Sequence, residues 1–228
     1  MPSALILAAG RGERMRPLTD AAPKPLLRVG GRTLIDWQLS RLAAGGIRRV
    51  VINHAHLGEM LEAAVGEGSR WGLRVDWSRE GTALETAGGI AKALALLGDE
   101  PFVVVSGDIH TDYDFSRLEA VAKDIARDPG RRAAHFVLVD NPPYHPGGDM
   151  GLEGSLVRRA GPLLTYANIA VFHPALFAGI VPGTHLKLFP WAYRFVDEGR
   201  VTGERFTGTW ENLGTPAQLA DLDRRLKP

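Results

Sequence analysis

The chain has 228 residues, of which 45% are hydrophobic and 23% are charged, so its composition is that of a globular protein. Its formal net charge of +1 gives no reason to expect nucleic acid or a membrane surface as a partner. The absence of cysteine excludes disulfides and thiolate metal sites, and no apolar run is long enough for a signal peptide or a membrane span, so we expect a cytoplasmic protein.

Strands and helices alternate through the first half of the chain. Residues 3–9 are apolar on both faces, as in a buried parallel strand, and residues 33–45 have apolar side chains at helical spacing. The same reading gives strands at 48–53, 73–80 and 101–108 and helices at 56–66, 85–98 and 116–127. This order predicts a Rossmann-like, doubly wound, mostly parallel α/β sheet.

After residue 128 the pattern becomes richer in strands. A strand is expected at 131–142, then a loop and a hairpin turning at Glu153-Gly154. Further along we expect a strand at 165–177 that runs into a short helix near Pro174, a helix at 186–199, a strand at 201–210 and a terminal helix opened by Pro216. No linker separates the halves, so residues 1–228 are expected to form one domain, with a smaller β-rich lid on the same sheet.

The loop after the first strand concentrates positive charge. Gly10 and Gly12 open the stretch 11–28, which carries a local net charge of +3. Ligands of open α/β sheets bind beyond the carboxyl ends of the strands, and glycine lets the backbone approach them closely. Arginine and lysine at this density suit a polyphosphate.

Two other interpretations of this loop remain open at this point. It could be a solvated surface loop whose arginines have no ligand. It could also belong to a dinucleotide-binding fold, although Met15 stands where the third glycine of G-x-G-x-x-G is required. The Walker phosphate-binding pattern is absent from the loop.

The stretch LAAGRGERMRPLTDAAPKPLL (7–27) resembles the signature loop of the sugar-1-phosphate nucleotidylyltransferases, roughly L-A-A-G-x-G-x-R-M/L-x-P-L-T followed by P-K-P. The likeness continues through SGD (106–108) to W-x-x-x-G-T-P (210–216). It implies the GT-A-like fold of nucleotide-diphospho-sugar transferases, with a nucleotide-binding half over about 1–128 and a sugar-binding half over about 129–228.

The resemblance also implies roles for single residues. The backbone of Ala8, Ala9 and Gly10 should lie against the nucleotide, and Lys24 should reach a phosphate near the reacting phosphorus. The full nucleotide-binding set is Ala8, Ala9, Gly10, Arg11, Gly12, Glu13, Arg14, Lys24, Asn53, Glu85, Thr86, Gly88 and Gly89. Arg14, Lys24 and Asp108 are the expected catalytic residues.

Mg²⁺ is the implied cofactor, with Asp108 as its first ligand. Many members have a second aspartate in W-x-D-x-G-T, and Asn212 stands at that position here. Its carbonyl oxygen can bind a hard cation but brings no charge, so substrate phosphates and water should hold the metal more. Asn141, Asp149 and Asn168 are the candidates for binding the sugar.

Each candidate also has a purely structural interpretation. Asp108 could cap the turn after its strand, and Asn212 could be a turn residue before glycine. Glu85 could be a first-turn acid favoured by the helix dipole. Gly88 and Gly89 weaken a helix, and close approach of a planar base would explain them.

Within the family, five segments are most similar to the uridylyltransferases that act on N-acetylmuramate 1-phosphate in peptidoglycan recycling. They are INHAHLG (52–58), LETAGGI (84–90), GDIHTDYDF (107–115), LVDNP (138–142) and HPALF (173–177). The implied substrates are UTP, or another nucleoside triphosphate, and a sugar 1-phosphate. The alternatives are a mannose-1-phosphate guanylyltransferase, a glucose-1-phosphate thymidylyl- or uridylyltransferase, and a non-catalytic nucleotide-sugar sensor. The sequence gives no oligomeric state.

Overall fold

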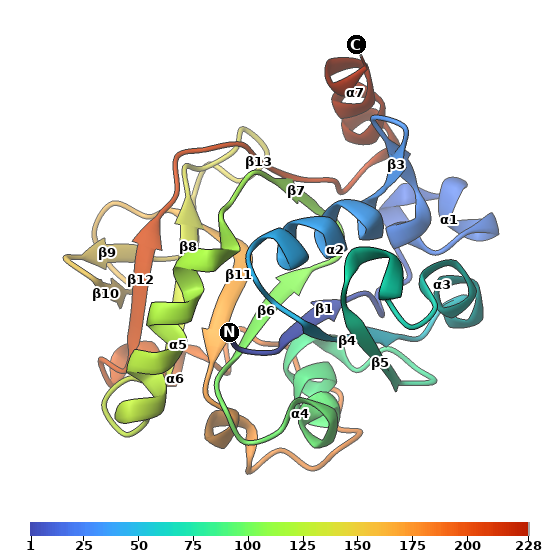
Figure 1. Ribbon diagram of the computed structural model, residues 1–228. Coiled ribbons are helices and arrows are strands. Elements are labelled where there is room, and N and C mark those ends of the chain that lie inside the picture. Colours follow the sequence, from blue (N-terminus) through green and yellow to red (C-terminus); the bar gives the residue numbers. More distant parts are fainter. Residues whose placement is uncertain (228) are drawn as a thin grey trace.

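The computed structural model describes residues 1–227, and a nine-stranded sheet runs through its centre (Figure 1). Four parallel strands form one half of it: β5 (Arg74–Arg79), β4 (Arg49–His54), β1 (Ala4–Leu7) and β6 (Phe102–Ser106), in this spatial order. These are the four strands expected in the first half of the chain, so the predicted parallel arrangement is confirmed.

Strands from the second half of the chain extend the same sheet. The order continues from β6 through β11 (Thr165–Phe172), β8 (Ala134–Val139), β12 (Val201–Arg205), β10 (Leu156–Arg158) and β9 (Gly151–Glu153). β11 is antiparallel to β6 and to β8, and its register shifts between Tyr166 and Ala170. The predicted hairpin is present, but its turn lies at Gly154-Ser155, because Glu153 pairs with Leu156.

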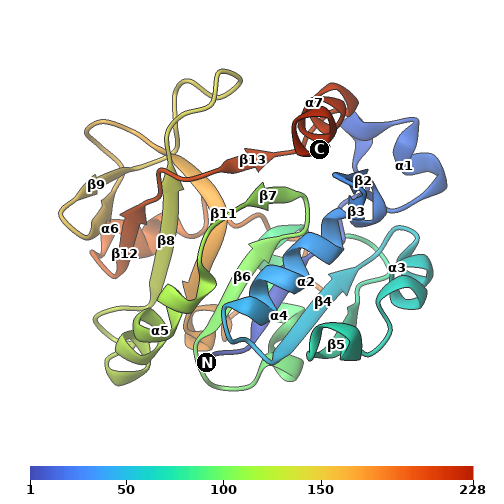
Figure 2. The ribbon, with the colours of Figure 1, turned by 45° about the horizontal axis from the view of Figure 1, so that its top comes forward.

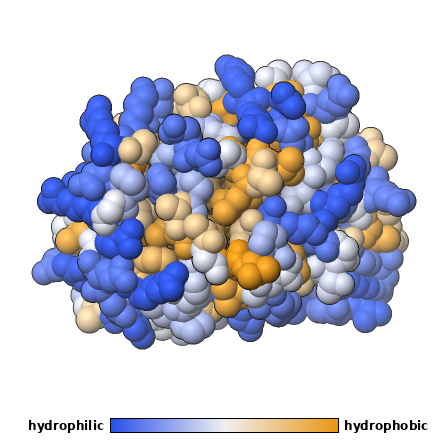
Figure 3. All heavy atoms as spheres, turned by 90° about the horizontal axis from the view of Figure 1, so that it is seen from below, coloured by the Kyte–Doolittle hydropathy of each residue, from blue (hydrophilic) through white to orange (hydrophobic). Residues whose placement is uncertain are grey.

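Helices cover both faces of the sheet (Figures 1 and 2). One face packs against α2 (Leu34–Ala44), α3 (Gly58–Val65) and α5 (Leu118–Arg127), and the other against α4 (Glu85–Leu97) and α6 (Tyr193–Asp197). β1 serves both layers, because Ala4 and Ile6 join the first core and Leu5 joins the second. Seen from below, apolar atoms form a central band between hydrophilic side chains (Figure 3).

The loop after β1 contains three short helical turns that the sequence did not predict. They are η1 (Glu13–Met15), α1 (Leu18–Ala21) and η2 (Lys24–Leu26). Next come β2 (Arg28–Val29) and β3 (Arg32–Thr33), and α7 (Pro216–Leu226) packs over this region through a third apolar cluster around Met15 and Leu219. The C-terminal helix therefore holds the first loop in place (Figure 2).

Two secondary-structure predictions are wrong. The expected helix at 186–199 shrinks to α6, because Leu186 exchanges backbone hydrogen bonds with Leu84 and Gly88 instead. The expected strand at 201–210 breaks in two. β12 stays in the main sheet, whereas β13 (Trp210–Asn212) pairs with β7 (Ile109–Thr111) in a separate antiparallel ribbon. The break places Asn212 beside the end of β6.

Other expected elements are confirmed with small changes at their ends. The strand expected at 131–142 is β8, and the strand expected at 165–177 is β11 followed by the short helix η5 (Pro174–Phe177). A membrane-spanning helix is not found among residues 1–227, since no helix there has the required length and apolar character.

Candidate active site

The loop after β1 presents a run of backbone N–H groups. In the described part of the chain, the N–H groups of Ala9, Gly10, Arg11 and Gly12 donate no hydrogen bond. Gly12 has a left-handed φ of 69°, and a Cβ there would lie 3.0 Å from Thr19 Cγ2. Successive N–H groups in such a bend attract anions. Within residues 1–227 the loop therefore offers four unpaired N–H donors to an anion.

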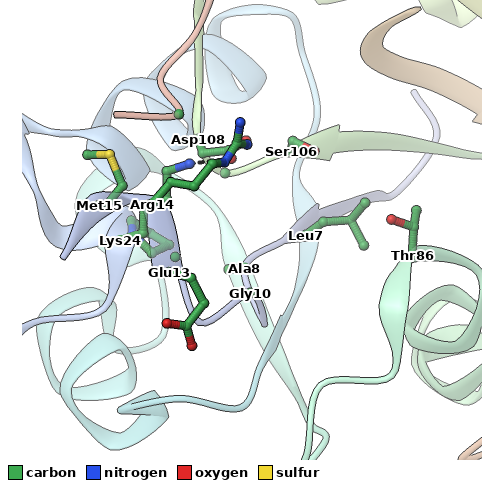
Figure 4. A pocket seen from close by; sticks show the side chains of 14 residues that line it. Leu7, Ala8, Gly10, Glu13, Arg14, Met15, Lys24, Thr86, Ser106 and Asp108 are labelled. Atoms are coloured by element: carbon green, nitrogen blue, oxygen red, sulfur yellow. Dashed lines mark hydrogen bonds and ion pairs between the residues drawn. The ribbon is translucent and has the colours of Figure 1, made fainter. Parts of the chain in front are cut away.

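The arginines of the loop divide into two groups. Arg11 donates to the Thr19 carbonyl at 2.7 Å and to Asp20 at 2.6 Å, and Arg16 lies 2.9 Å from the same carboxylate. The hydrogen bond from Arg11 lowers the pKa of Asp20. Arg14 makes no ion pair within residues 1–227 and points toward the cleft (Figure 4). Part of the local charge thus stabilises the loop, and part remains for a ligand.

Lys24 and Asp108 meet inside one cleft, as their predicted roles require. Lys24 Nζ donates to Asp108 Oδ2 at 2.7 Å, and Lys24 is only 8% exposed (Figure 4). The cleft has a volume of about 330 Å³, and its walls come from the first loop, the turn after β6, Thr86 and Gly214. Glu13 lines it as well, but its carboxylate points away from the lysine (Figure 4).

Asp108 and Asn212 are two oxygen donors of the kind that hold a divalent cation. Their segments are adjacent, because Asn212 pairs with Ile109 and Leu213 N donates to the Asp108 carbonyl at 3.0 Å. Asn212 Oδ1 is buried and has no hydrogen-bond partner among residues 1–227. Glu211 does not assist, since Arg225 occupies its carboxylate at 2.6 Å. Mg²⁺ often has few protein ligands and takes the rest from substrate phosphates and water.

No richer metal centre competes with this pair. Residues 1–227 contain no group of three or more histidine, cysteine, aspartate or glutamate side chains placed to hold a metal. The carboxylate of Asp108 and the orphaned amide oxygen of Asn212 are therefore the donors that these residues offer.

A second cleft of about 260 Å³ adjoins the first through Leu7, Gly10 and Thr86. Asn53 lines it, yet its amide is used within the protein. Asn53 Oδ1 accepts from Ala8 N at 2.7 Å, and its Nδ2 donates to Glu80 Oε1 at 2.6 Å. Ala8 and Asn53 were both predicted to lie at the nucleotide, and in the structure the N–H group of Ala8 donates to the Asn53 side chain.

Glu80 is a buried acid that the sequence analysis missed. It is 8% exposed, and its second oxygen accepts from Leu84 N at 2.9 Å. Burial raises the pKa of Glu80, and the hydrogen bonds from Leu84 and Asn53 oppose that effect. The one signal in the sequence is its position, because an acid closes a strand directly before the turn that leads to α4.

The two glycines at the start of α4 are explained by contacts within the protein. A Cβ on Gly89 would lie 2.6 Å from Glu80 Oε1, and a Cβ on Gly88 would lie 2.1 Å from the Thr184 carbonyl. Neither glycine lines the clefts described above. Close approach of a base is therefore not needed to account for them.

Glu85 and Thr86 do lie at the second cleft. Glu85 begins α4 with a positive φ of 62°, and its carboxylate lies 3.9 Å from His185 Nε2. Thr86 lines both clefts. The N-terminus of α4 therefore faces the same space as the loop after β1.

A third cleft of about 240 Å³ contains two of the three expected sugar-binding residues, Asp149 and Asn168. Asp149 holds His145 at 3.0 Å and accepts from Tyr166 N at 2.8 Å. Asn168 has a φ of 57° inside the register shift of β11. Asn212 lines this cleft as well, so the third cleft reaches the expected metal position.

Asn141 does not line this third cleft. Its amide nitrogen donates to the carbonyls of Pro146 and Leu163, and its oxygen accepts from Thr165 Oγ1 at 2.9 Å. Its side-chain amide thus ties the loop before β9 to the segment that leads into β11. The structure gives Asn141 a supporting position rather than the expected contact surface.

Comparison with known proteins agrees with this arrangement. Residues 3–145 match the protein family described as nucleotidyl transferase. The chain is 47% identical over 223 residues to the N-acetylmuramate alpha-1-phosphate uridylyltransferase of Neisseria meningitidis serogroup B, covering 96% of this chain and 95% of that protein. It is 36% identical over 235 residues to the enzyme of the same name from Caulobacter vibrioides, covering 98% and 96%.

A solved structure shares the fold. The putative glucose-1-phosphate thymidylyltransferase of Bacillus anthracis matches with a TM-score of 0.85 at 18% identity, covering 100% of this chain and 96% of that one. The expected α/β fold of nucleotide-diphospho-sugar transferases is therefore confirmed. The bare surface loop and the dinucleotide-binding fold are no longer needed as explanations of the first loop.

Proposed function

The chain belongs to the nucleotidyl transferase family, and we propose that it transfers UMP from UTP to N-acetyl-α-muramate 1-phosphate, giving UDP-N-acetylmuramate and pyrophosphate. One observation carries the proposal: the ion pair of Lys24 and Asp108 lies in the same cleft as the N–H-rich loop. Relatives that match over nearly their whole length support the choice of substrates. The reaction would belong to peptidoglycan recycling in the cytoplasm.

The reaction needs positioning and charge neutralisation more than acid–base catalysis. A phosphate oxygen of the sugar phosphate attacks the α-phosphorus of UTP, in line with the departing pyrophosphate. The attacking oxygen is already an anion, so no general base is required. The chain has to bring two polyanions together and stabilise the charge on the leaving group.

The residues of the cleft divide this work between them. The N–H groups of residues 9–12 and the guanidinium of Arg14 would hold the triphosphate and then the pyrophosphate. Lys24 would offset the charge of the attacking phosphate, and its flexible chain can carry the ammonium there from Asp108. Mg²⁺ on Asp108 and Asn212 would supply positive charge shared between the two phosphates.

The flanking clefts fit the remaining parts of the substrates. The cleft with Glu85 and Thr86 would take the uridine, and the cleft with Asp149 and Asn168 would take the sugar. The reacting phosphates would then lie between them, beside Lys24 and Asp108.

A panel assay of pyrophosphate release tests the proposal. UTP, GTP and dTTP are each combined with N-acetylmuramate 1-phosphate, mannose 1-phosphate and glucose 1-phosphate in the presence of Mg²⁺. We expect the highest kcat/KM for UTP with N-acetylmuramate 1-phosphate. A higher value for GTP with mannose 1-phosphate, or for dTTP or UTP with glucose 1-phosphate, would reassign the substrates. UTP binding without turnover in any combination would identify a sensor.

A further inference from the structure

Three hydrogen bonds connect the loop after β1 to the start of α4 through one buried carboxylate. Ala8 N donates to Asn53 Oδ1, Asn53 Nδ2 donates to Glu80 Oε1, and Leu84 N donates to Glu80 Oε2. The three distances are 2.7, 2.6 and 2.9 Å. Gly89 leaves the space in which the carboxylate and the amide meet.

The carboxylate fixes the direction of every bond in this chain. An ionised carboxylate only accepts hydrogen bonds, so the Asn53 amide must turn its NH₂ group toward Glu80. The carbonyl oxygen of Asn53 is thereby directed at Ala8 N. Asn53 is 2% exposed, so water does not offer its amide another partner. Glu80 itself lines none of the three clefts.

We propose that Glu80 is a positioning residue for UTP: through Asn53 it sets the backbone of the phosphate-binding loop, and through Leu84 it sets the N-terminus of α4. The inference rests on the proposed nucleotidyl transfer. Both ends of the hydrogen-bond chain reach the nucleotide side of the site, because Ala8 lines the phosphate cleft and Thr86 follows two residues after Leu84. The sugar-side residues Asp149 and Asn168 lie outside it.

The substitution Glu80→Gln reverses one of the hydrogen bonds at nearly constant volume. A glutamine at this position offers one acceptor and one donor to two donors, Asn53 Nδ2 and Leu84 N. Either the Asn53 amide turns over and meets Ala8 N with its NH₂ group, or Leu84 N loses its acceptor. We expect the KM for UTP to rise by about tenfold or more, with the KM for the sugar phosphate within about twofold of wild type.

A double variant restores the polarity of the bonds without restoring the original residues. In Glu80→Gln with Asn53→Asp, the new amide donates to the new carboxylate and accepts from Leu84 N, while the new carboxylate accepts from Ala8 N. The net charge is the same as in wild type. We expect the double variant to recover the KM for UTP to within about threefold, whereas Asn53→Asp alone places two carboxylates together and is worse.

Glu204→Gln is the matched control. Glu204 lies on β12, is partly buried, accepts from Tyr113 and Arg117, and lines none of the three clefts. The Glu204→Gln substitution should lower the melting temperature and leave the KM for UTP unchanged. All assays are run well below the lowest melting temperature of the set, and calorimetry gives the dissociation constant for UTP in parallel.

Two outcomes would overturn the inference: a Glu80→Gln variant with the wild-type KM and dissociation constant for UTP, or a double variant no better than the single ones. A wild-type protein without turnover in the substrate panel would instead refute the proposed function. In that case the dissociation constants for UTP still decide the role of Glu80.

Discussion

The cations of the first loop show how little a charge count says about single residues. Arg11 and Arg16 are bound to Asp20 within the loop, whereas Arg14 and Lys24 line the cleft that holds Asp108. Nothing in the residue types separates these pairs. The separation appears only in the structure, where Asp20 on α1 pairs with both Arg11 and Arg16. Substitutions of Arg14 or Lys24 should therefore change the rate of the reaction, whereas substitutions of Arg11 or Arg16 should change the conformation of the loop.

Lys24→Ala is expected to lower kcat by about a hundredfold or more, because it removes the ammonium that offsets phosphate charge in the cleft. The substitution leaves Asp108 partly open to solvent, so the fold should persist and the circular dichroism spectrum should match wild type. Arg16→Ala is the control, since Arg16 pairs only within the loop and should cost no more than a few-fold. Near-wild-type turnover of Lys24→Ala would contradict the assigned role.

Asn212→Asp should tighten the binding of the divalent cation by about tenfold, because it adds a second carboxylate beside Asp108. The orphaned Asn212 Oδ1 would be replaced by a charged oxygen at the same position. Titration with Mn²⁺, followed by calorimetry without substrates, measures the effect independently of turnover. An unchanged affinity, together with an unchanged affinity in Asn212→Ala, would show that position 212 is not a ligand.

At the level of elements, the sequence predicted what local periodicity can encode. The four strands of the first half and helices α2 to α5 have continuous apolar patterns, and all of them are present. The predictions failed for segments whose structure is set by hydrogen bonds to distant parts of the chain. Leu186 is bound to the start of α4, about a hundred residues earlier, and β13 pairs with β7 at a similar separation. No pattern within 186–199 or 201–210 contains that information.

The candidate site divides in the same way. Lys24 and Asp108 were predicted from family motifs, and the structure brings them together. Glu80 was not predicted, because its role depends on contact with Asn53, which is 27 residues away in the chain. Asn141 was expected at the sugar, yet its amide holds the neighbouring loop. Motifs mark the segments near the clefts, but they do not show which residues of a segment line a cleft and which support it.

The link between β12 and the segment before α5 should give stability that depends on pH. Burial by itself would raise the pKa of Glu204, but interactions with His135, Tyr113 and Arg117 outweigh it and hold the pKa below its usual 4.5. An acid with a lowered native pKa stabilises the fold above its unfolded pKa and loses that contribution as pH falls through the native value. Urea unfolding should therefore show a drop in stability below about pH 4.5 that is smaller in Glu204→Gln. An equal drop in both proteins would contradict this link.

At the scale of the molecule, the two halves of the chain share one sheet. β6, from the first half, is bordered by β1 on one side and by β11, from the second half, on the other. The second core also mixes them, because Phe102 packs against Phe172 and Phe177 at ring-centroid distances of 6.4 Å. The two sides of the candidate site are therefore parts of one layer, joined by β6, which ends two residues before Asp108.

This continuity predicts one cooperative unfolding unit rather than two domains. A fragment of residues 1–128 would leave β6 as an open edge with Phe102 and Val104 uncovered on one face, so it should aggregate or remain unfolded. Full-length protein should unfold in urea with coincident transitions by tryptophan fluorescence and circular dichroism, since tryptophans occur in both halves. Two separated transitions, or a soluble 1–128 fragment with a native-like melting curve, would show that the halves fold independently and that the shared sheet is only a contact between them.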